Sequence, residues 1–162
     1  MIFDPPTFLL IHIVLSVLGI ITGLVVVGGL MAGARLDGWT GFFLSTTVLT
    51  SVTGFGFPFV KVLPPHIVGA LSLVVLAVCL AARYWKRLAG GWSAIYVVTA
   101  VIALYLNTFV LVVQLFAKTP PLAALAPTPG APAQAGTQLI VLAIFVWLGR
   151  AALKGFRSDA LR

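Results

Sequence analysis

Residues 8–33 read FLLIHIVLSVLGIITGLVVVGGLMAG, and this stretch contains no Asp, Glu, Lys or Arg. A helix needs about 20 consecutive apolar residues to cross the hydrocarbon core of a bilayer. The stretch is therefore long enough to span the core with some tilt. Pro5 and Pro6 stand just before it, a position that suits the start of a helix. It lacks the preceding basic region of a cleaved signal peptide, so we expect a retained membrane span.

The composition of the whole chain points the same way. The chain has 162 residues, of which 61% are hydrophobic and 8% charged, and its mean hydropathy is +1.17. A soluble domain carries about a quarter charged residues. The polar surface is too small to cover a globule in water, so the sequence predicts an integral membrane protein whose first partner is the lipid bilayer. Its basic residues lie in short links and at the C-terminus, which fits topology control and anionic headgroups better than nucleic acid.

Four more apolar runs follow, at about 40–59, 66–82, 92–117 and 137–153. The stretch Lys61-Val62-Leu63-Pro64-Pro65-His66 predicts a tight turn that joins the second and third runs as antiparallel neighbours. Residues 118–136 are rich in Pro, Ala and Gly, so they are expected to form a loop and no regular span. We therefore predict one all-α integral membrane domain over 1–162, a polytopic five-helix up-down transmembrane bundle.

The positive charges predict the orientation of this bundle. Ten Lys and Arg side chains oppose three Asp. The side that would be cytoplasmic holds Arg35, Arg83, Lys86, Arg87, Arg150, Lys154, Arg157 and Arg162. The other side holds Lys61 and Lys118. This bias predicts an outside N-terminus, a cytoplasmic C-terminus and an outside 118–136 loop, in a bacterial inner membrane. The alternative treats the fifth run as a re-entrant or amphipathic segment and leaves four spans.

Four polar residues are expected to converge near the outer surface. His12 lies about one turn inside the first run and His66 opens the third, while Asn107 and Gln114 fall in the outer half of the fourth. Gln138 lies near the outer end of the fifth run. Polar groups are costly in hydrocarbon, so they should face protein or a water-filled cavity. We predict an outward-facing polar pocket with His12, His66, Asn107 and Gln114 as ligand contacts.

Three interpretations of the two histidines stay open. Paired imidazoles can ligate haem iron axially, so His12 and His66 are candidate metal ligands for one b-type haem. They could instead contact an organic ligand such as a quinone or lipid, or simply hydrogen-bond backbone carbonyls at the interface. Two histidines are too few for a closed zinc site. The stripes of small and hydroxyl residues in the same runs also arise from helix packing alone.

Several function classes are disfavoured. Cys79 is the single cysteine, so the chain has no intrachain disulfide and no CxxC redox motif. No carboxylate falls inside a predicted span, although proton-coupled carriers usually need one. A Gly-rich phosphate loop is absent, and the serines have no adjacent Asp-His pair. We predict no catalytic residue, and a non-enzymatic role is favoured.

The first part of the chain resembles a family of small, uncharacterised bacterial inner-membrane proteins. The resemblance rests on His12 in the first run, a Gly-rich stretch to Gly33, a link with Arg35, and Thr53-Gly54-Phe55 late in the second run, within about the first 85 residues. A looser likeness links it to cytochrome b-type and copper-resistance membrane domains, which also place histidines at span ends. Those domains carry more histidines, so the likeness implies at most one haem.

Three functions follow as hypotheses. The first is a membrane protein whose outward pocket binds a cofactor or small apolar ligand; with haem, it would pass electrons between quinone and a periplasmic carrier. The second is a structural accessory subunit, or an oligomer-forming protein within a homo-oligomer or larger membrane complex, with the small-residue stripes as interfaces. The third and least favoured is a channel or carrier.

Overall fold

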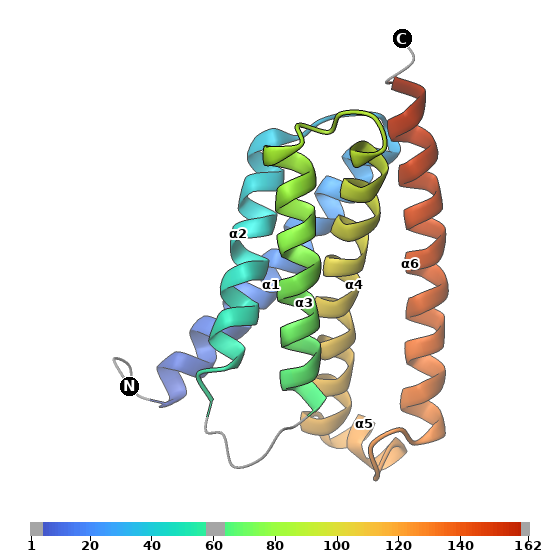
Figure 1. Cartoon of the computed structure of the whole chain (residues 1–162). Helices are drawn as coiled ribbons and strands as arrows, with labels where there is room; N and C mark the ends of the chain where they lie inside the picture. The colour runs from blue at the N-terminus through green and yellow to red at the C-terminus, as the bar shows by residue number, and fades with distance from the viewer. Residues whose placement is uncertain (1–4, 58–63, 160–162) are drawn as a thin grey trace.

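The chain folds into a bundle of helices in a computed structural model that describes residues 5–57 and 64–159. In chain order these are α1 (Pro5–Met31), α2 (Asp37–Gly54), α3 (Pro64–Leu80), the π-helix η1 (Ala81–Trp85), α4 (Trp92–Lys118), α5 (Pro120–Leu125) and α6 (Pro132–Asp159) (Figure 1). The described residues contain no strand, so the predicted all-α class is confirmed. The predicted turn over residues 61–63 lies outside the described residues, and α3 begins at Pro64.

Four helices among the described residues are long and apolar enough to cross a membrane: α1, α3 with η1, α4 and α6. The predicted fifth run is part of α6, a continuous helix of 28 residues, which exceeds the length that a membrane crossing needs. Helix α2, which corresponds to the predicted second run, is not one of these four helices. Helix α2 has only 18 residues and is rich in hydroxyl side chains and glycine.

Five hydroxyl groups of α2 donate to carbonyls of their own helix, those of Thr46, Thr47, Thr50, Ser51 and Thr53. Thr46 donates to the carbonyl of Phe42 at 2.8 Å, and Thr47 donates to that of Phe43 at 2.7 Å. Ser51 donates to the Thr47 carbonyl at 2.9 Å. A helix that meets its side-chain donors in this way can lie in an apolar bundle without unpaired polar groups.

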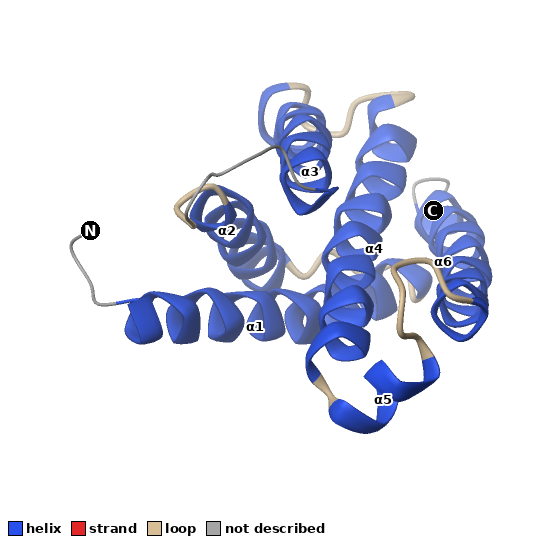
Figure 2. Cartoon of the chain, turned by 90° about the horizontal axis from the view of Figure 1, so that it is seen from below, coloured by secondary structure: helices blue, strands red, loops and turns tan. Residues whose placement is uncertain are grey.

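Helix α1 crosses the bundle obliquely, whereas the other long helices run more nearly upright (Figures 1 and 2). It contacts α2, α4 and α6 in turn. Its N-terminal part lies beside α2, where the rings of Phe8 and Phe57 are 5.1 Å apart. Its C-terminal part lies against α6, where a Cβ on Gly155 would overlap the Met31 carbonyl. The crossing of α1 leaves space between its first turns and α4, where a pocket lies.

Helix α4 is the central helix: half of its most apolar stretch is buried, against 17% for that of α6. The side chains of Tyr96, Ala100, Ala103 and Leu104 have no exposed surface. They share one face of α4, as their spacing of three and four residues requires. The apolar core therefore forms around this face, while the outer face of α6 carries exposed hydrophobic side chains.

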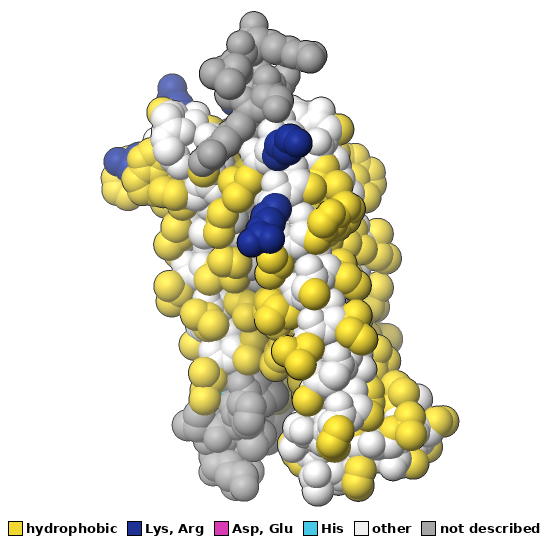
Figure 3. Space-filling view, turned by 90° about the vertical axis from the view of Figure 1, so that its right-hand side faces the viewer, with side chains coloured by type: hydrophobic (Ala, Val, Ile, Leu, Met, Phe, Trp, Pro, Cys, Tyr) yellow, Lys and Arg dark blue, Asp and Glu magenta, His cyan; other side chains and the backbone are white. Residues whose placement is uncertain are grey.

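Figure 3 shows one side of the molecule covered largely by hydrophobic side chains, with the Lys and Arg side chains gathered toward one end. Exposed residues on this scale mark a surface that contacts lipid or protein. Among them on α6 are Leu139 at 66% and Trp147 at 61% exposure. The distribution fits a helical bundle with an apolar belt and a basic end.

The helices begin and end at residues that differ from the limits of the predicted runs and loop. Helix α2 ends at Gly54, where the sequence predicted a run to residue 59, because Phe55, Gly56 and Phe57 form a turn. Helix α6 begins at Pro132, five residues before the predicted 137. The segment 118–136 was predicted as a loop, yet it includes the short helix α5. Prolines stand in the first turn of both α5 and α6, where a missing N–H costs nothing.

Candidate functional site

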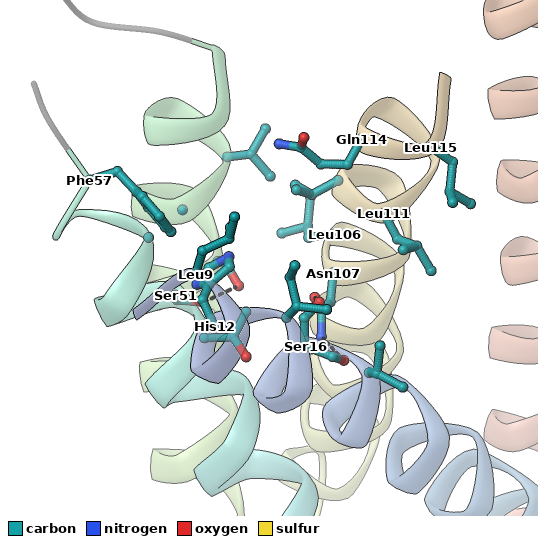
Figure 4. Close-up of a pocket in the computed structure, with 18 of the residues that line it drawn as sticks. Leu9, His12, Ser16, Ser51, Phe57, Leu106, Asn107, Leu111, Gln114 and Leu115 are labelled. Atoms are coloured by element: carbon teal, nitrogen blue, oxygen red, sulfur yellow. Dashed lines mark hydrogen bonds between the residues drawn. The ribbon is translucent and has the colours of Figure 1, made fainter. Parts of the chain in front are cut away.

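A pocket of about 540 Å³ lies between α1, α2, α3 and α4, at the end of the bundle where α4 leads into α5. It follows α4 from Leu106 to Lys118, a distance of about 18 Å at 1.5 Å per residue. Its walls are largely apolar and include Leu9, Ile13, Val17, Leu106, Val110 and Leu111. Figure 4 shows these helices enclosing the space, with the Gln114 amide pointing into it from α4.

His12 reaches the pocket from the third turn of α1. Its Nδ1 atom lies 2.9 Å from the hydroxyl oxygen of Thr53 on α2. That hydroxyl also lies 2.7 Å from the Leu49 carbonyl, to which it donates its hydrogen. Its oxygen must then accept from His12, which places the imidazole proton on Nδ1. In its neutral form the ring keeps a lone pair on Nε2, and this atom makes no hydrogen bond within the described part of the chain.

Two features hold the His12 ring in place. Phe57 stands at 90° to it with ring centroids 5.2 Å apart. On the other side, a Cβ at Gly54 would lie 3.7 Å from the His12 Cε1 atom, so the backbone of α2 is close to the ring. A ring that is fixed by a hydrogen bond and packing is presented to a ligand in one orientation.

His66 enters the pocket from the first turn of α3. Its side chain is buried, and its ring lies 6.0 Å from that of Phe55. Gln114 and Lys118 line the pocket nearer its α5 end. Gln114 is half-buried, and no hydrogen bond from its amide is present among the described residues. Gln114 thus offers a ligand both a donor and an acceptor.

Asn107 is committed to a different interaction. Its Oδ1 accepts a hydrogen bond from the Ser16 hydroxyl at 2.8 Å, and its Nδ2 donates to the Ser16 carbonyl at 3.2 Å. A Cβ at Gly19 would lie 3.1 Å from Nδ2, so the glycine makes room for the amide. This reciprocal pair joins α1 to α4 at the deep end of the pocket. Asn107 therefore lines the pocket mainly as a structural clamp.

The four residues predicted as ligand contacts, His12, His66, Asn107 and Gln114, all line this one pocket. Gln138, which the sequence places near the outer end of the fifth run, does not line this pocket. Its Nε2 donates to the Phe109 carbonyl at 3.0 Å, which ties α6 to α4. Its Oε1 is buried and has no hydrogen-bond partner among the described residues. Helix α6 packs on the far side of α4, so its polar residues do not reach the pocket.

The charge distribution restricts what the pocket can hold. Lys118 is the one cation among the described lining residues, and no carboxylate is among them. No group of three or more His, Cys, Asp or Glu side chains that could hold a metal ion occurs in the described residues. The pocket is therefore suited to a neutral, mainly apolar molecule that carries a hydrogen-bonding group.

The residues that form the apolar walls of the pocket, such as Leu9, Val110 and Leu111, could not be recognised from the sequence. An apolar side chain in a membrane helix carries the same signal whether it faces lipid or a cavity. The contact between the Ser51 and Ser72 hydroxyls, 3.2 Å apart, was also missed. The hydroxyl stripe on α2 was the signal that could have suggested it.

Comparisons with known proteins identify no relative of this chain. No protein-family model matches it. Neither the curated proteins nor the solved structures include a significant match. Function must therefore be argued from the pocket itself.

Proposed function

We propose that the pocket binds a small, mainly apolar organic molecule with a hydroxyl or carbonyl head, of the quinone or lipid class. One observation carries the proposal: an apolar space of about 540 Å³ contains two polar groups with capacity left for a ligand, His12 Nε2 and the Gln114 amide. A ligand hydroxyl would donate to the Nε2 lone pair, and a ligand carbonyl would accept from the Gln114 amide. The apolar walls would take the tail.

The proposal includes an orientation and an environment. We propose that α2 crosses the membrane with the other long helices, which makes five spans. Eight of the ten cations then lie on the cytoplasmic side of a bacterial inner membrane. The pocket mouth, near Lys118, would face outward. The hydroxyl-rich α2 is acceptable in this position because most of its hydroxyl donors bond to its own backbone.

Binding, rather than catalysis, is the proposed role. The described residues lining the pocket include no carboxylate and no nucleophile paired with a base. His12 is the lining residue that most resembles a general base, but its Nδ1 is occupied by the hydrogen bond to Thr53. The lining residues therefore support holding a ligand near the membrane surface and offer no assembled reaction centre.

A single b-type haem is the second candidate. It is favoured by one observation: His12 and His66 line the same pocket, and His12 presents an unprotonated Nε2. It is disfavoured by the shortage of cations, since Lys118 alone would meet the haem propionates among the described lining residues. Haem binding would give the protein a role in electron transfer.

One experiment separates these roles. The protein is purified in a neutral detergent, its absorbance spectrum is recorded, and its organic extract is analysed by mass spectrometry for quinones and lipids. The purified protein is also titrated with a quinone carrying a short alkyl tail. His12→Ala and Gln114→Ala are compared with Ser45→Ala, which removes an exposed hydroxyl of α2 outside the pocket.

We expect saturable quinone binding that falls in both pocket variants and is unchanged in Ser45→Ala. A Soret band that disappears in His12→Ala would favour haem instead. A colourless protein that retains no ligand and does not saturate with the quinone would contradict both. The role as a structural subunit of a homo-oligomer or larger complex would then be the better account.

A further inference from the structure

A second cavity, of about 420 Å³, lies at the opposite end of the bundle from the pocket. It is formed where the link from α1 to α2 meets η1 and the turn that follows η1. Its lining residues are Arg35, Asp37, Arg83, Tyr84, Arg87 and Leu88. We call this cavity the arginine cavity. The sequence placed Arg35, Arg83 and Arg87 on the same side of the membrane, but it did not predict a cavity.

Arg83 is the fixed centre of the arginine cavity. Its side chain is only 7% exposed, and it forms an ion pair with Asp37, the first residue of α2. Its guanidinium carbon also lies 5.1 Å from the ring centroid of Tyr96 and 5.6 Å from that of Tyr84. Asp37 itself remains 80% exposed. The buried guanidinium is thus held in one place by the carboxylate and by two aromatic rings.

The backbone around Arg83 departs from a regular helix. Residues 81–85 form a π-helix, and the amide of Lys86 bonds to the Ala81 carbonyl at 2.8 Å. Single-turn π segments within α-helices occur frequently at functional sites. The next two residues, Arg87 and Leu88, have positive φ angles of 50° and 61°. This tight turn of the chain brings Arg87 to the wall of the cavity that Arg83 and Arg35 also line.

The arginine cavity carries an excess of positive charge. Three arginines line it, and Asp37 is the one carboxylate among its described lining residues. Arg35 packs over the ring of Phe156 at 5.7 Å, and neither it nor Arg87 forms an ion pair with a carboxylate in the described residues. Guanidinium groups bind phosphate with planar, paired N–H donors. Two of the three arginines therefore retain their full capacity for an anion.

The surroundings place the arginine cavity at the level of lipid headgroups. Tyr84, which lines the cavity, is 55% exposed, and the next residue, Trp85, is 79% exposed. Exposed Trp and Tyr side chains at the ends of membrane helices concentrate in the interfacial region. Basic pockets between membrane helices at this depth bind phosphorylated headgroups.

We propose that the arginine cavity binds a phosphate group, supplied by an anionic phospholipid headgroup or by a free phosphate ion. Arg35 and Arg87 would hold the phosphate oxygens, and Arg83 would add positive charge from the cavity wall. Asp37 keeps Arg83 oriented toward the cavity. The proposal is independent of the ligand of the first pocket.

The test uses the full chain in neutral detergent and native mass spectrometry. One arm titrates phosphatidylglycerol against phosphatidylcholine, and the other titrates inorganic phosphate. Arg87→Gln and Arg35→Gln each remove one cavity charge without breaking an ion pair described in the structure. Arg150→Gln removes the same charge from an exposed site on α6 outside the cavity and is the matched control.

We expect preferential binding of phosphatidylglycerol that weakens about fivefold in each cavity variant and is unchanged in Arg150→Gln. Binding of inorganic phosphate with the same dependence on Arg87 and Arg35, and no preference for phosphatidylglycerol, would assign the site to free phosphate. Equal losses in Arg150→Gln and the cavity variants would overturn the proposal, because the attraction would then be a property of the whole basic end. So would the absence of binding in both arms.

Discussion

The Nδ1 atom of His12 on α1 lies 2.9 Å from the hydroxyl oxygen of Thr53 on α2. The Thr53 hydroxyl donates its hydrogen to the Leu49 carbonyl of its own helix. The His12 imidazole is therefore the donor in its bond with Thr53. This relationship defines which face of the histidine is available to a ligand. It also joins the two helices that frame the pocket mouth. The following predictions depend on such contacts between helices.

The hydrogen bond from His12 to Thr53 should matter more for ligand binding than for stability. Thr53→Val removes the acceptor and lets the His12 ring rotate and change tautomer. Because one hydrogen bond is worth about 1 kcal/mol net, we expect quinone affinity to fall roughly fivefold. Thr53→Ser keeps the hydroxyl and should bind as the wild type does. Titration of both variants with the short-tailed quinone checks this, and equal affinity in Thr53→Val would contradict the assigned tautomer.

The reciprocal pair between Ser16 and Asn107 should stabilise the bundle. Replacing Asn107 with Leu removes both hydrogen bonds between α1 and α4. Interhelical hydrogen bonds of this kind contribute about 0.6 to 2 kcal/mol in membrane proteins, so we expect a loss of about 1 kcal/mol in the free energy of unfolding. Denaturation in mixed micelles measures it.

A double-mutant cycle separates the pair from other effects of the substitution. Ser16→Ala, Asn107→Ala and the double variant are unfolded in the same micelles. We expect a coupling energy of about 0.5 to 1 kcal/mol. Strictly additive losses would show that the two side chains act independently and that Asn107 is free to serve a ligand.

Gly155 should be indispensable where α6 meets α1. A Cβ at this position would overlap the carbonyl of Met31, which belongs to the backbone and cannot move alone. We expect Gly155→Ala to destabilise the protein by about 1 to 3 kcal/mol, the usual cost of overpacking. Gly149→Ala is the control, because its Cβ would lie at an ordinary 3.5 Å from the side chain of Val101. Thermal unfolding of the two variants should differ, and similar midpoints would argue against the close contact of α6 with α1.

The orientation is tested by labelling single cysteines from outside the cell. Cys79 is buried and can be replaced by Ala to give a cysteine-free background. A cysteine at Ala124, exposed on α5, should react with an impermeant maleimide in intact cells. A cysteine at Ala89, exposed in the turn after η1, should react only after lysis. The reverse pattern would place the pocket mouth in the cytoplasm.

The sequence predicted the helical class and the polar residues of the pocket because both rest on strong local signals. Long uncharged runs are expensive in water, and His12, His66, Asn107 and Gln114 are expensive in hydrocarbon. The structure brings these four residues to one pocket. Whether they contact a ligand stays a prediction.

What the sequence could not predict depends on packing between helices. The oblique path of α1 follows from contacts such as those of Gly19 and Gly155, whose partners are distant in the chain. Gln138 lies near the outer end of the predicted fifth run but away from the pocket, because α6 packs behind α4. Arg83 was expected at the interface, but its side chain is buried against Tyr96 and paired with Asp37. The π-helix that positions it has no recognisable sequence signal.

Photolabelling tests the central claim most directly. The protein in membranes is irradiated with a quinone whose tail carries a photoactivatable azide, and the labelled peptides are mapped by mass spectrometry. We predict labelling within residues 9–17 of α1 and 106–115 of α4, and its loss with excess unlabelled quinone. Gly54→Leu, which places a larger side chain beside the His12 ring, should reduce it. Labelling spread over the exposed side chains of α6, such as Leu139 and Trp147, without competition by unlabelled quinone, would contradict a ligand site in this pocket.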